Sequence, residues 1–277
     1  MPVFIYGVSL SFLPRHHCYI QKFTIMSRLI FPALLLAVAV TLVSYKITHI
    51  KHTASHAGGD AGFAVVELFT SEGCSSCPPA DAALAGLLNE GKSNVYVLGF
   101  HVDYWNNLGW RDVYSNALYS ARQQGYSGIF KLNSVYTPHA VVNGKIEFTG
   151  SDTKRLNDAV ENGLNHPAAG LVEITAKSSG KVITVLYKLS QPELNSTINI
   201  ALVQLHAQSN VKNGENSGKM LNHVNVVRNF KTVNYKLSQG DVVIEIPEGL
   251  VASDCKIIAF AQKASGEITC AAQTAIQ

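Results

Sequence analysis

Hydrophobic and polar residues follow two different patterns along this chain of 277 residues. Between residues 63 and 166, apolar β-branched runs alternate with segments whose apolar residues recur at helical spacing, which predicts strands and helices in βαβα order. From Leu171 onward the chain shows short strand-like runs separated by polar turns, a pattern typical of a small β-sandwich or meander. The break at residues 166–170 therefore predicts a boundary between two domains.

Individual elements can be placed from these patterns. Helices are predicted at 80–88, at 113–124, and through Leu164 after a cap at Ser151-Asp152. Asn143-Gly144 between two apolar runs predicts a β-hairpin. The predicted strands are 63–70, 94–100, 140–142, 145–148, 171–177, 181–189, 198–207, 224–233, 242–246, 256–262 and 267–273.

Cys74 and Cys77 lie where a predicted strand ends and a predicted helix begins. Two cysteines at this spacing can close a disulfide, and the free N–H groups at a helix start lower the pKa of a thiol there. Cys74 would then be the exposed nucleophile, and Cys77 the shielded cysteine that resolves a mixed disulfide. A permanently closed structural disulfide and half of a zinc site are the alternatives, although the sequence has no second CxxC or HxxxH at zinc-like spacing.

The N-terminal part predicts export. An almost wholly apolar run of 17 residues extends from Leu29 to Tyr45 after Arg28, a length between that of a signal peptide and that of a membrane span. Residues 1–57 are therefore expected to be a leader or membrane anchor, with Met26 as the true start and Ser55-His56-Ala57 as a cleavage point. The protein is expected to be periplasmic or secreted, with membrane contact only through this segment, in a compartment that permits disulfides.

The net positive charge of the chain comes from that leader. The whole chain has a formal charge of +3, but 17 basic and 19 acidic residues lie from residue 58 onward, a formal charge of −2. A nucleic-acid-binding face would need a basic patch in the folded part, so no nucleic-acid partner is expected.

The order of elements over residues 63–166 resembles the thioredoxin fold. In that family a cis-proline faces the CxxC motif and the residue before it presents backbone to the substrate; Thr137-Pro138 has this place, with a trans proline at a strand start as the alternative. Glu67 has the place of a buried acid that handles the proton of the resolving thiol, with an acid at an open strand end as the alternative. The resemblance thus implies catalytic roles for Cys74, Cys77, Thr137, Pro138 and Glu67.

A more specific resemblance covers about residues 63–273. The segment from Glu67 to Asp81, which reads ELFTSEGCSSCPPAD, and the later segments 101–105, 214–218 and 225–228 are similar to a bacterial secreted-protein family, domain of unknown function 1223. This resemblance implies an α/β thioredoxin-like domain at 58–167, with the CxxC at a helix N-terminus, followed by a C-terminal all-β, sandwich-like domain at 168–277. It brings no established reaction, and His139 stands where the family pattern has glutamine.

Further candidates follow the second predicted strand, at the sheet edge where ligands usually bind. His101, Asp103 and Trp105 are expected to bind substrate, together with Tyr136 and His139 beside the Thr-Pro. The alternatives are aromatic packing, a hydrogen bond from His101 to a backbone carbonyl, and an ion pair of Asp103 that fixes the loop. The segment 214–218 predicts a tight turn whose Glu and Asn satisfy backbone groups.

Cys255 and Cys270 are predicted to remain free. They lie on the two strands of a predicted hairpin, in a register that separates them by four positions, or about 13 Å. A disulfide cannot span that distance, so both are expected to be small buried hydrophobic residues.

Three functions remain open from the sequence. The first is an exported thiol–disulfide oxidoreductase that exchanges disulfides through Cys74 and Cys77 with a protein or small-thiol partner, without a cofactor. The second is a copper-handling envelope protein in which these cysteines, with His101 or His139, hold Cu(I). The third is a non-catalytic binding module whose closed disulfide stiffens a loop.

Overall fold

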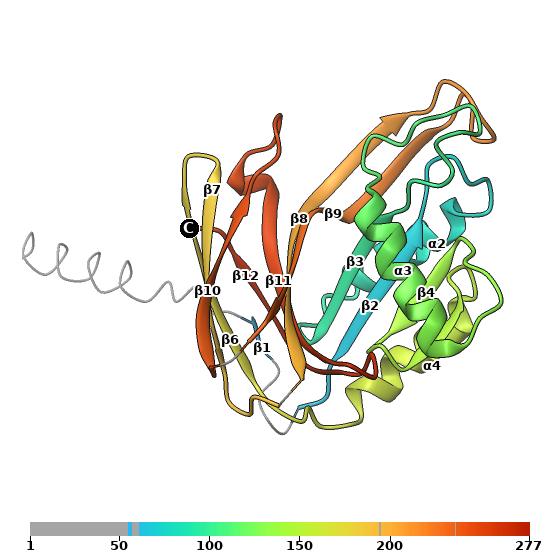
Figure 1. Cartoon of the computed structure of the whole chain (residues 1–277). Coiled ribbons are helices and arrows are strands. Elements are labelled where there is room, and N and C mark those ends of the chain that lie inside the picture. The colour runs from blue at the N-terminus through green and yellow to red at the C-terminus, as the bar shows by residue number, and fades with distance from the viewer. Residues whose placement is uncertain (1–54, 57–60, 194, 236) are drawn as a thin grey trace, which may run out of the picture. The chain divides into compact units, whose positions relative to one another are not determined.

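The computed structural model describes residues 55–56, 61–193, 195–235 and 237–277 (Figure 1). The chain from Thr53 onward forms one compact unit. The apolar run at 29–45 and the expected start at Met26 lie outside the described residues, as does most of the expected leader. In the part that is described, no helix combines the length and apolar character needed to cross a membrane.

Every predicted strand and helix is present, with bounds shifted by a few residues. Strands β8 and β9, of 15 residues each, are longer than predicted. The elements are β1 (Ser55–His56), β2 (Ala64–Thr70), α2 (Pro78–Asn89), β3 (Val95–His101), α3 (Ala117–Phe130), β4 (His139–Val142), β5 (Ile146–Thr149), α4 (Thr153–Leu164), β6 (Val172–Ser179), β7 (Val182–Leu189), β8 (Ser196–Asn210), β9 (Met220–Asn234), β10 (Gln239–Glu245), a 3-10 helix (Ala252–Asp254), β11 (Cys255–Lys263) and β12 (Ile268–Ala275).

The strands form two sheets. A nine-stranded mixed sheet has the order β1-β12-β11-β8-β9-β3-β2-β4-β5, and a three-stranded sheet has the order β10-β7-β6. Strand β2 pairs in parallel with β3 and antiparallel with β4, whereas β8 and β9 form a long antiparallel hairpin. The two halves of the large sheet meet where β9 runs parallel to β3, at the pair Gly99 and Val226.

This junction corrects the expected fold class. The thioredoxin-like α/β domain followed by a separate all-β domain is wrong, because strands of both parts belong to one continuous sheet. At this junction the Val224 carbonyl oxygen lies 3.5 Å from the place that a Cβ atom on Gly99 would take, which is an ordinary van der Waals distance. Asn225 then donates a hydrogen bond of 2.9 Å to the Val97 carbonyl. The alternation of apolar residues predicts a strand but does not specify its neighbour.

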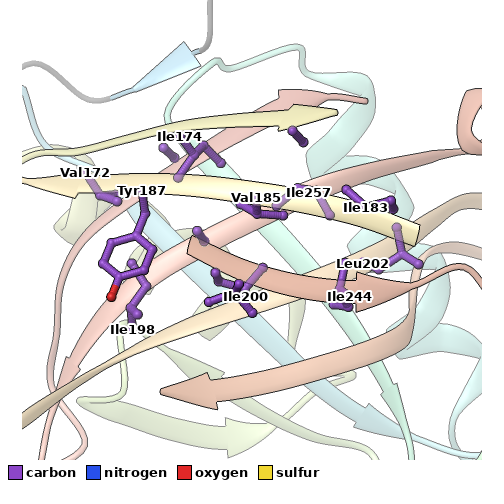
Figure 2. Packing of buried hydrophobic residues seen from close by; sticks show 14 of the residues in the cluster. Val172, Ile174, Ile183, Val185, Tyr187, Ile198, Ile200, Leu202, Ile244 and Ile257 are labelled. Carbon is purple, nitrogen blue, oxygen red and sulfur yellow. The ribbon is translucent and has the colours of Figure 1, made fainter. Parts of the chain in front are cut away.

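Three buried clusters occupy the faces of the sheets. Helices α2 and α4 cover one face of β2, β3 and β4 through Leu84 and Leu156, and α3 covers the other face through Tyr119 and Tyr126. The α3 cluster continues onto β8 and β11, so it belongs to both halves of the large sheet. The third cluster lies between the three-stranded sheet and the opposite face of β8, β11 and β12 (Figure 2).

Replacement of Asn225 tests the β3–β9 junction. Asn225 is buried and has a φ of 46°, so Asn225→Ala removes a hydrogen bond to a buried carbonyl and also strains the backbone. We expect a loss of about 2–4 kcal/mol in the free energy of unfolding, measured by urea denaturation. Asn225→Gly should lose less, because glycine tolerates this φ.

Asn222→Ala, at an exposed position of the same strand, is the matched control and should change stability by less than about 0.5 kcal/mol. Equal stabilities of Asn225→Ala and this control would contradict the structural role given to Asn225.

Candidate functional site

The cysteine pair lies on the connection between β2 and α2. Cys74 and Cys77 form a disulfide, with their Cα atoms 5.4 Å apart. Cys77 is the residue before the first turn of α2, where Pro78 costs no hydrogen bond because this position has no intrahelical acceptor. The Cys74 carbonyl accepts from the Cys77 N–H at 3.2 Å, which closes the loop.

The expectation that Cys74 is exposed is wrong. Both cysteines have an exposed fraction of 0%, whereas Ser75 and Ser76 between them are exposed. The Cys74 sulfur lies 3.3 Å from the Ser76 hydroxyl oxygen. The serines, and not the sulfurs, therefore form the outer surface of the motif.

The turn between β8 and β9 covers this loop. Asn216, which is fully buried, donates to the Glu72 carbonyl at 2.9 Å and to the Cys74 carbonyl at 2.8 Å. Glu215 accepts from the Ser75 N–H at 2.9 Å. The prediction that the Glu and Asn of this turn satisfy backbone groups is confirmed, and the groups are those of the CxxC loop. The additional length of β8 and β9 carries the turn to this place.

The Thr-Pro segment lies on another side of the loop. The Thr137–Pro138 peptide bond is cis, as predicted. The Thr137 carbonyl accepts from the Ser76 hydroxyl at 3.5 Å. The side-chain hydroxyl of Thr137 accepts from the Trp105 indole N–H at 2.8 Å. Trp105 also packs on Gly73, because its Cβ lies 3.2 Å from the place of a Cβ on that glycine. The structure thus brings Thr137 and Trp105 to the loop that carries the two cysteines.

Glu67 is held in a buried ion pair. It is fully buried on β2, so the alternative of an acid at an open strand end is wrong. The Arg122 guanidinium binds both carboxylate oxygens, at 2.5 and 2.9 Å, and the Tyr126 hydroxyl donates to one of them at 2.6 Å. Burial alone would lower the pKa of Arg122, but Glu67 and Tyr126 raise it. A proton-handling role of Glu67 therefore stays a prediction.

The His101 side chain contacts a carboxylate, and not the backbone carbonyl considered as an alternative above. Its Nδ1 lies 2.6 Å from the Asp112 Oδ2, with both side chains buried. The same Asp112 oxygen accepts from the Glu72 N–H at 2.9 Å. Burial raises the pKa of Asp112, but the charge and hydrogen bond of His101 and the backbone N–H donors outweigh it, so this pKa is lowered. This pair fixes the loop ahead of Cys74.

The other expected substrate-binding residues have internal partners. Asp103 accepts from the Ser120 hydroxyl on α3 at 2.5 Å, which is a hydrogen bond and not the ion pair considered above. The Tyr136 hydroxyl donates to Glu147 at 2.7 Å, and the His139 Nε2 lies 3.4 Å from the same oxygen. Burial lowers the pKa of His139 although Glu147 opposes this. A substrate role for these residues stays a prediction.

Three charged residues that sequence reasoning did not single out lie against the motif. The His223 Nε2 is 3.5 Å from the Glu72 Oε1, and its Nδ1 is 3.6 Å from the Asp81 Oδ2. We call Glu72, His223 and Asp81 the charged row. The contacts are too long for hydrogen bonds, so the attraction is electrostatic. The Trp110 indole N–H donates to the other oxygen of Glu72 at 2.7 Å.

The charged row keeps its imidazole protonated. Burial alone would lower the pKa of His223, but Asp81 and Glu72 raise it to about 9. The sequence did contain a signal, because Leu221, His223 and Asn225 alternate on the buried side of β9. A histidine and an asparagine on the inward face of a strand indicate polar partners in the core.

The alternative copper site stays a prediction, because its cysteines are joined in a disulfide in this structure. In residues 61–277, apart from the two positions left out, no group of three or more His, Cys, Asp or Glu side chains is placed to hold a metal ion. Cys74, Cys77 and His101 are thus not brought together as ligands, and the two cysteines are bonded to each other.

Cys255 and Cys270 are free and buried, as predicted. The register differs from the expected one, because Cys270 lies opposite Ala261 beside a β-bulge and Cys255 pairs with β8. Burial raises the pKa of Cys270 to about 11, so this thiol is unreactive at neutral pH.

The geometry of the motif can now be compared with known proteins. Residues 65–262 match the model of a family described as a protein of unknown function, DUF1223. The chain belongs to this family. No curated protein matches this DUF1223 member.

Solved structures give two further comparisons. The crystal structure of protein AGR_C_4864 from Agrobacterium tumefaciens is 28% identical, covers 78% of this chain and 96% of that chain, and has a TM-score of 0.55. A DUF3823 family protein from Bacteroides ovatus is 16% identical over 39% of this chain and 52% of that chain. Its TM-score of 0.27 is too low to indicate a common fold. The comparisons therefore establish a family and no reaction.

The contacts of the β8–β9 turn predict that loss of Asn216 increases access of reductants to the disulfide. Asn216→Ala removes a side-chain donor from two buried carbonyls, of which the Cys74 carbonyl keeps its bond from the Cys77 N–H, and should lower the free energy of unfolding by roughly 2–4 kcal/mol. Because the turn then opens more often, reduction of the Cys74–Cys77 disulfide by dithiothreitol should be faster by about tenfold or more, measured by thiol alkylation and mass spectrometry.

Asn213→Ala, at an exposed position of the same turn, is the control and should reduce at the wild-type rate. A wild-type reduction rate in Asn216→Ala as well would show that the turn does not limit access.

The raised pKa of His223 predicts that the stability of the protein depends on pH. Because the pKa of His223 is raised from 6.5 to about 9, its stabilisation is complete below about pH 6.5 and is lost as the pH rises through about 9. The wild type should exceed His223→Gln in unfolding free energy by up to about 3 kcal/mol at low pH, and this excess should disappear above pH 9, in urea titrations across this range.

His206→Gln, at an exposed position of β8, should follow the wild type at every pH. A difference between wild type and His223→Gln that is the same at both ends of the range would refute the raised pKa.

Proposed function

We propose that this protein exchanges disulfides through Cys74 and Cys77, with a protein or small-thiol partner in an oxidising compartment. The observation that carries this proposal is the disulfide itself, closed at the first turn of α2 between the β8–β9 turn and the Thr137 segment. The helix N–H groups favour a thiolate at this place, which makes the pair reactive once it is reduced.

The exchange needs no group besides the two cysteines. When the pair is reduced, the Cys74 thiolate attacks a substrate disulfide, one substrate sulfur leaves as a thiolate, and a mixed disulfide forms. The Cys77 thiolate then attacks Cys74 and releases the second substrate sulfur. Two electrons pass from the pair to the substrate, and the reverse sequence oxidises a substrate dithiol. The closed pair in this structure is the form that accepts electrons.

The surroundings of the motif support a partner that makes contact through backbone and hydroxyl groups. Ser75 and Ser76 are the exposed part of the loop, and the half-buried Thr137 and Trp105 flank it. The sulfurs have no exposed surface. Exchange therefore proceeds after a local displacement of the loop or of its cover, which a bound partner can stabilise.

The proposed compartment is the cell envelope or the medium. The apolar run at 29–45 supports export, and a disulfide in a folded protein is typical of oxidising compartments. The formal charge of −2 from residue 58 onward fits a protein that binds neither nucleic acid nor an anionic membrane surface through its folded part.

One observation favours a second function, a binding module with a structural disulfide. The zero exposure of Cys74 and Cys77 is what a bond that only stiffens the loop would show. The two functions differ in whether reduced protein transfers its electrons to another disulfide.

The deciding experiment is an exchange assay with the reduced protein and a scrambled or oxidised peptide substrate. The wild type should accelerate exchange, and Cys74→Ser should lower the rate at least about a hundredfold, to that of the uncatalysed reaction, because the attacking thiolate is absent. Cys77→Ser should accumulate a mixed disulfide with the substrate, visible by intact mass.

The double variant Cys255→Ser/Cys270→Ser controls for the other thiols and should exchange at the wild-type rate, because both are buried and free. If the wild type exchanges no faster than Cys74→Ser, the oxidoreductase proposal fails and the structural disulfide remains.

A further inference from the structure

The charged row touches the cysteine loop on both sides. Glu72 lies two residues before Cys74, and its carbonyl shares the Asn216 amide with the Cys74 carbonyl. Asp81 lies in the first turn of α2, and its N–H donates to the Cys77 carbonyl at 3.1 Å. His223 reaches both carboxylates from β9. Three elements thus place two carboxylates and one imidazolium beside the backbone of the cysteine loop.

These charges are held away from water. Glu72 is fully buried, His223 is 4% exposed and Asp81 is 9% exposed. A Glu72 oxygen and both ring nitrogens of His223 have no hydrogen-bond partner among the described residues. Buried charges that are only partly hydrogen-bonded act more strongly on their neighbours than exposed charges do, because water does not screen them.

The remaining groups around His223 form a second layer. The His101 ring on β3 lies 4.7 Å from the His223 ring, and the Tyr114 ring lies 5.8 Å from it. The Asp112 carboxylate lies 2.6 Å from the His101 Nδ1, and the Arg228 guanidinium on β9 lies 5.0 Å from the centre of the Tyr114 ring. In the charged row itself, one imidazolium faces two carboxylates. His223 therefore supplies the positive charge that offsets the negative charges of Glu72 and Asp81.

We propose that the charged row sets the reduction potential of the Cys74–Cys77 disulfide, with His223 as the positioning residue that balances the charge of Glu72 and Asp81. This inference rests on the proposed function for its biological use, because a tuned potential matters only if the pair exchanges disulfides. The row acts through its electric field on the sulfurs and takes part in no bond that forms or breaks.

The sign of the effect follows from the charge of the reduced pair. A glutathione thiolate attacks one sulfur, and the second cysteine leaves as a thiolate. A second glutathione thiolate attacks the mixed disulfide, forms glutathione disulfide and releases the first cysteine, so two electrons enter the pair. Where one cysteine stays a thiolate, a nearby cation stabilises the reduced form and a nearby anion destabilises it. His223 therefore favours reduction, and Glu72 and Asp81 oppose it.

The test measures the thiol–disulfide equilibrium of the full chain in a glutathione series, at a pH where the reduced pair is partly ionised. His223→Gln should shift the equilibrium about tenfold toward the disulfide, equivalent to about 30 mV. Asp81→Asn and Glu72→Gln should shift it by a similar factor toward the dithiol. The opposite directions identify a charge effect, because loss of packing would affect all three variants alike.

The double variant His223→Gln/Asp81→Asn should return toward the wild-type equilibrium, because it removes one charge of each sign. His206→Gln is the matched control and should not shift it. Asp81→Asn, at the edge of the row, keeps the test decisive if His223→Gln does not fold. Shifts in one common direction, or shifts below twofold, would overturn the inference.

The outcome is separate from that of the proposed function. The equilibrium constant is read by alkylation and mass spectrometry whether or not the protein accelerates exchange with a substrate. Normal exchange with equal equilibria would refute the charged row, and opposite shifts without any exchange activity would refute the oxidoreductase alone.

Discussion

The parallel contact of β9 with β3 is the constraint on which the rest of this structure depends. It is short, at the pair Gly99 and Val226, but it determines where the long β8–β9 hairpin lies. In that position the turn of the hairpin covers the cysteine loop through Asn216, and His223 lies between two carboxylates. One strand contact thus converts an isolated CxxC corner into a covered and charged site.

Much of the fold could be predicted from the sequence, because local signals specify the elements. Asn143-Gly144 turns the β4–β5 hairpin and Asp152 caps α4 through the Arg155 N–H. The sheet itself could not be predicted, because the alternation in β9 states which side is buried and not which strand is adjacent. The polar residues that β9 buries, His223 and Asn225, were the available sign that it meets polar partners.

The Glu67–Arg122 pair and the charged row differ in how their buried charges are satisfied. Glu67 has a bidentate guanidinium and a phenol, and four aromatic rings lie within 6 Å of the Arg122 carbon, so its charge is fully compensated locally. The charged row has longer contacts, of 3.5 and 3.6 Å, and lies beside the cysteine loop. The charged row differs from the Glu67 pair because one Glu72 oxygen and both ring nitrogens of His223 have no hydrogen-bond partner among the described residues.

The cover of the disulfide also has a consequence for the order of events during folding. Cys74 and Cys77 are neighbours along the chain, so a disulfide between them can close before distant segments meet. The amide that binds the Cys74 carbonyl lies 142 residues later, in Asn216. Closing contacts of such sequence separation is slow compared with local structure. The sulfurs are thus open to an oxidant early in folding and lose that access only when the hairpin closes.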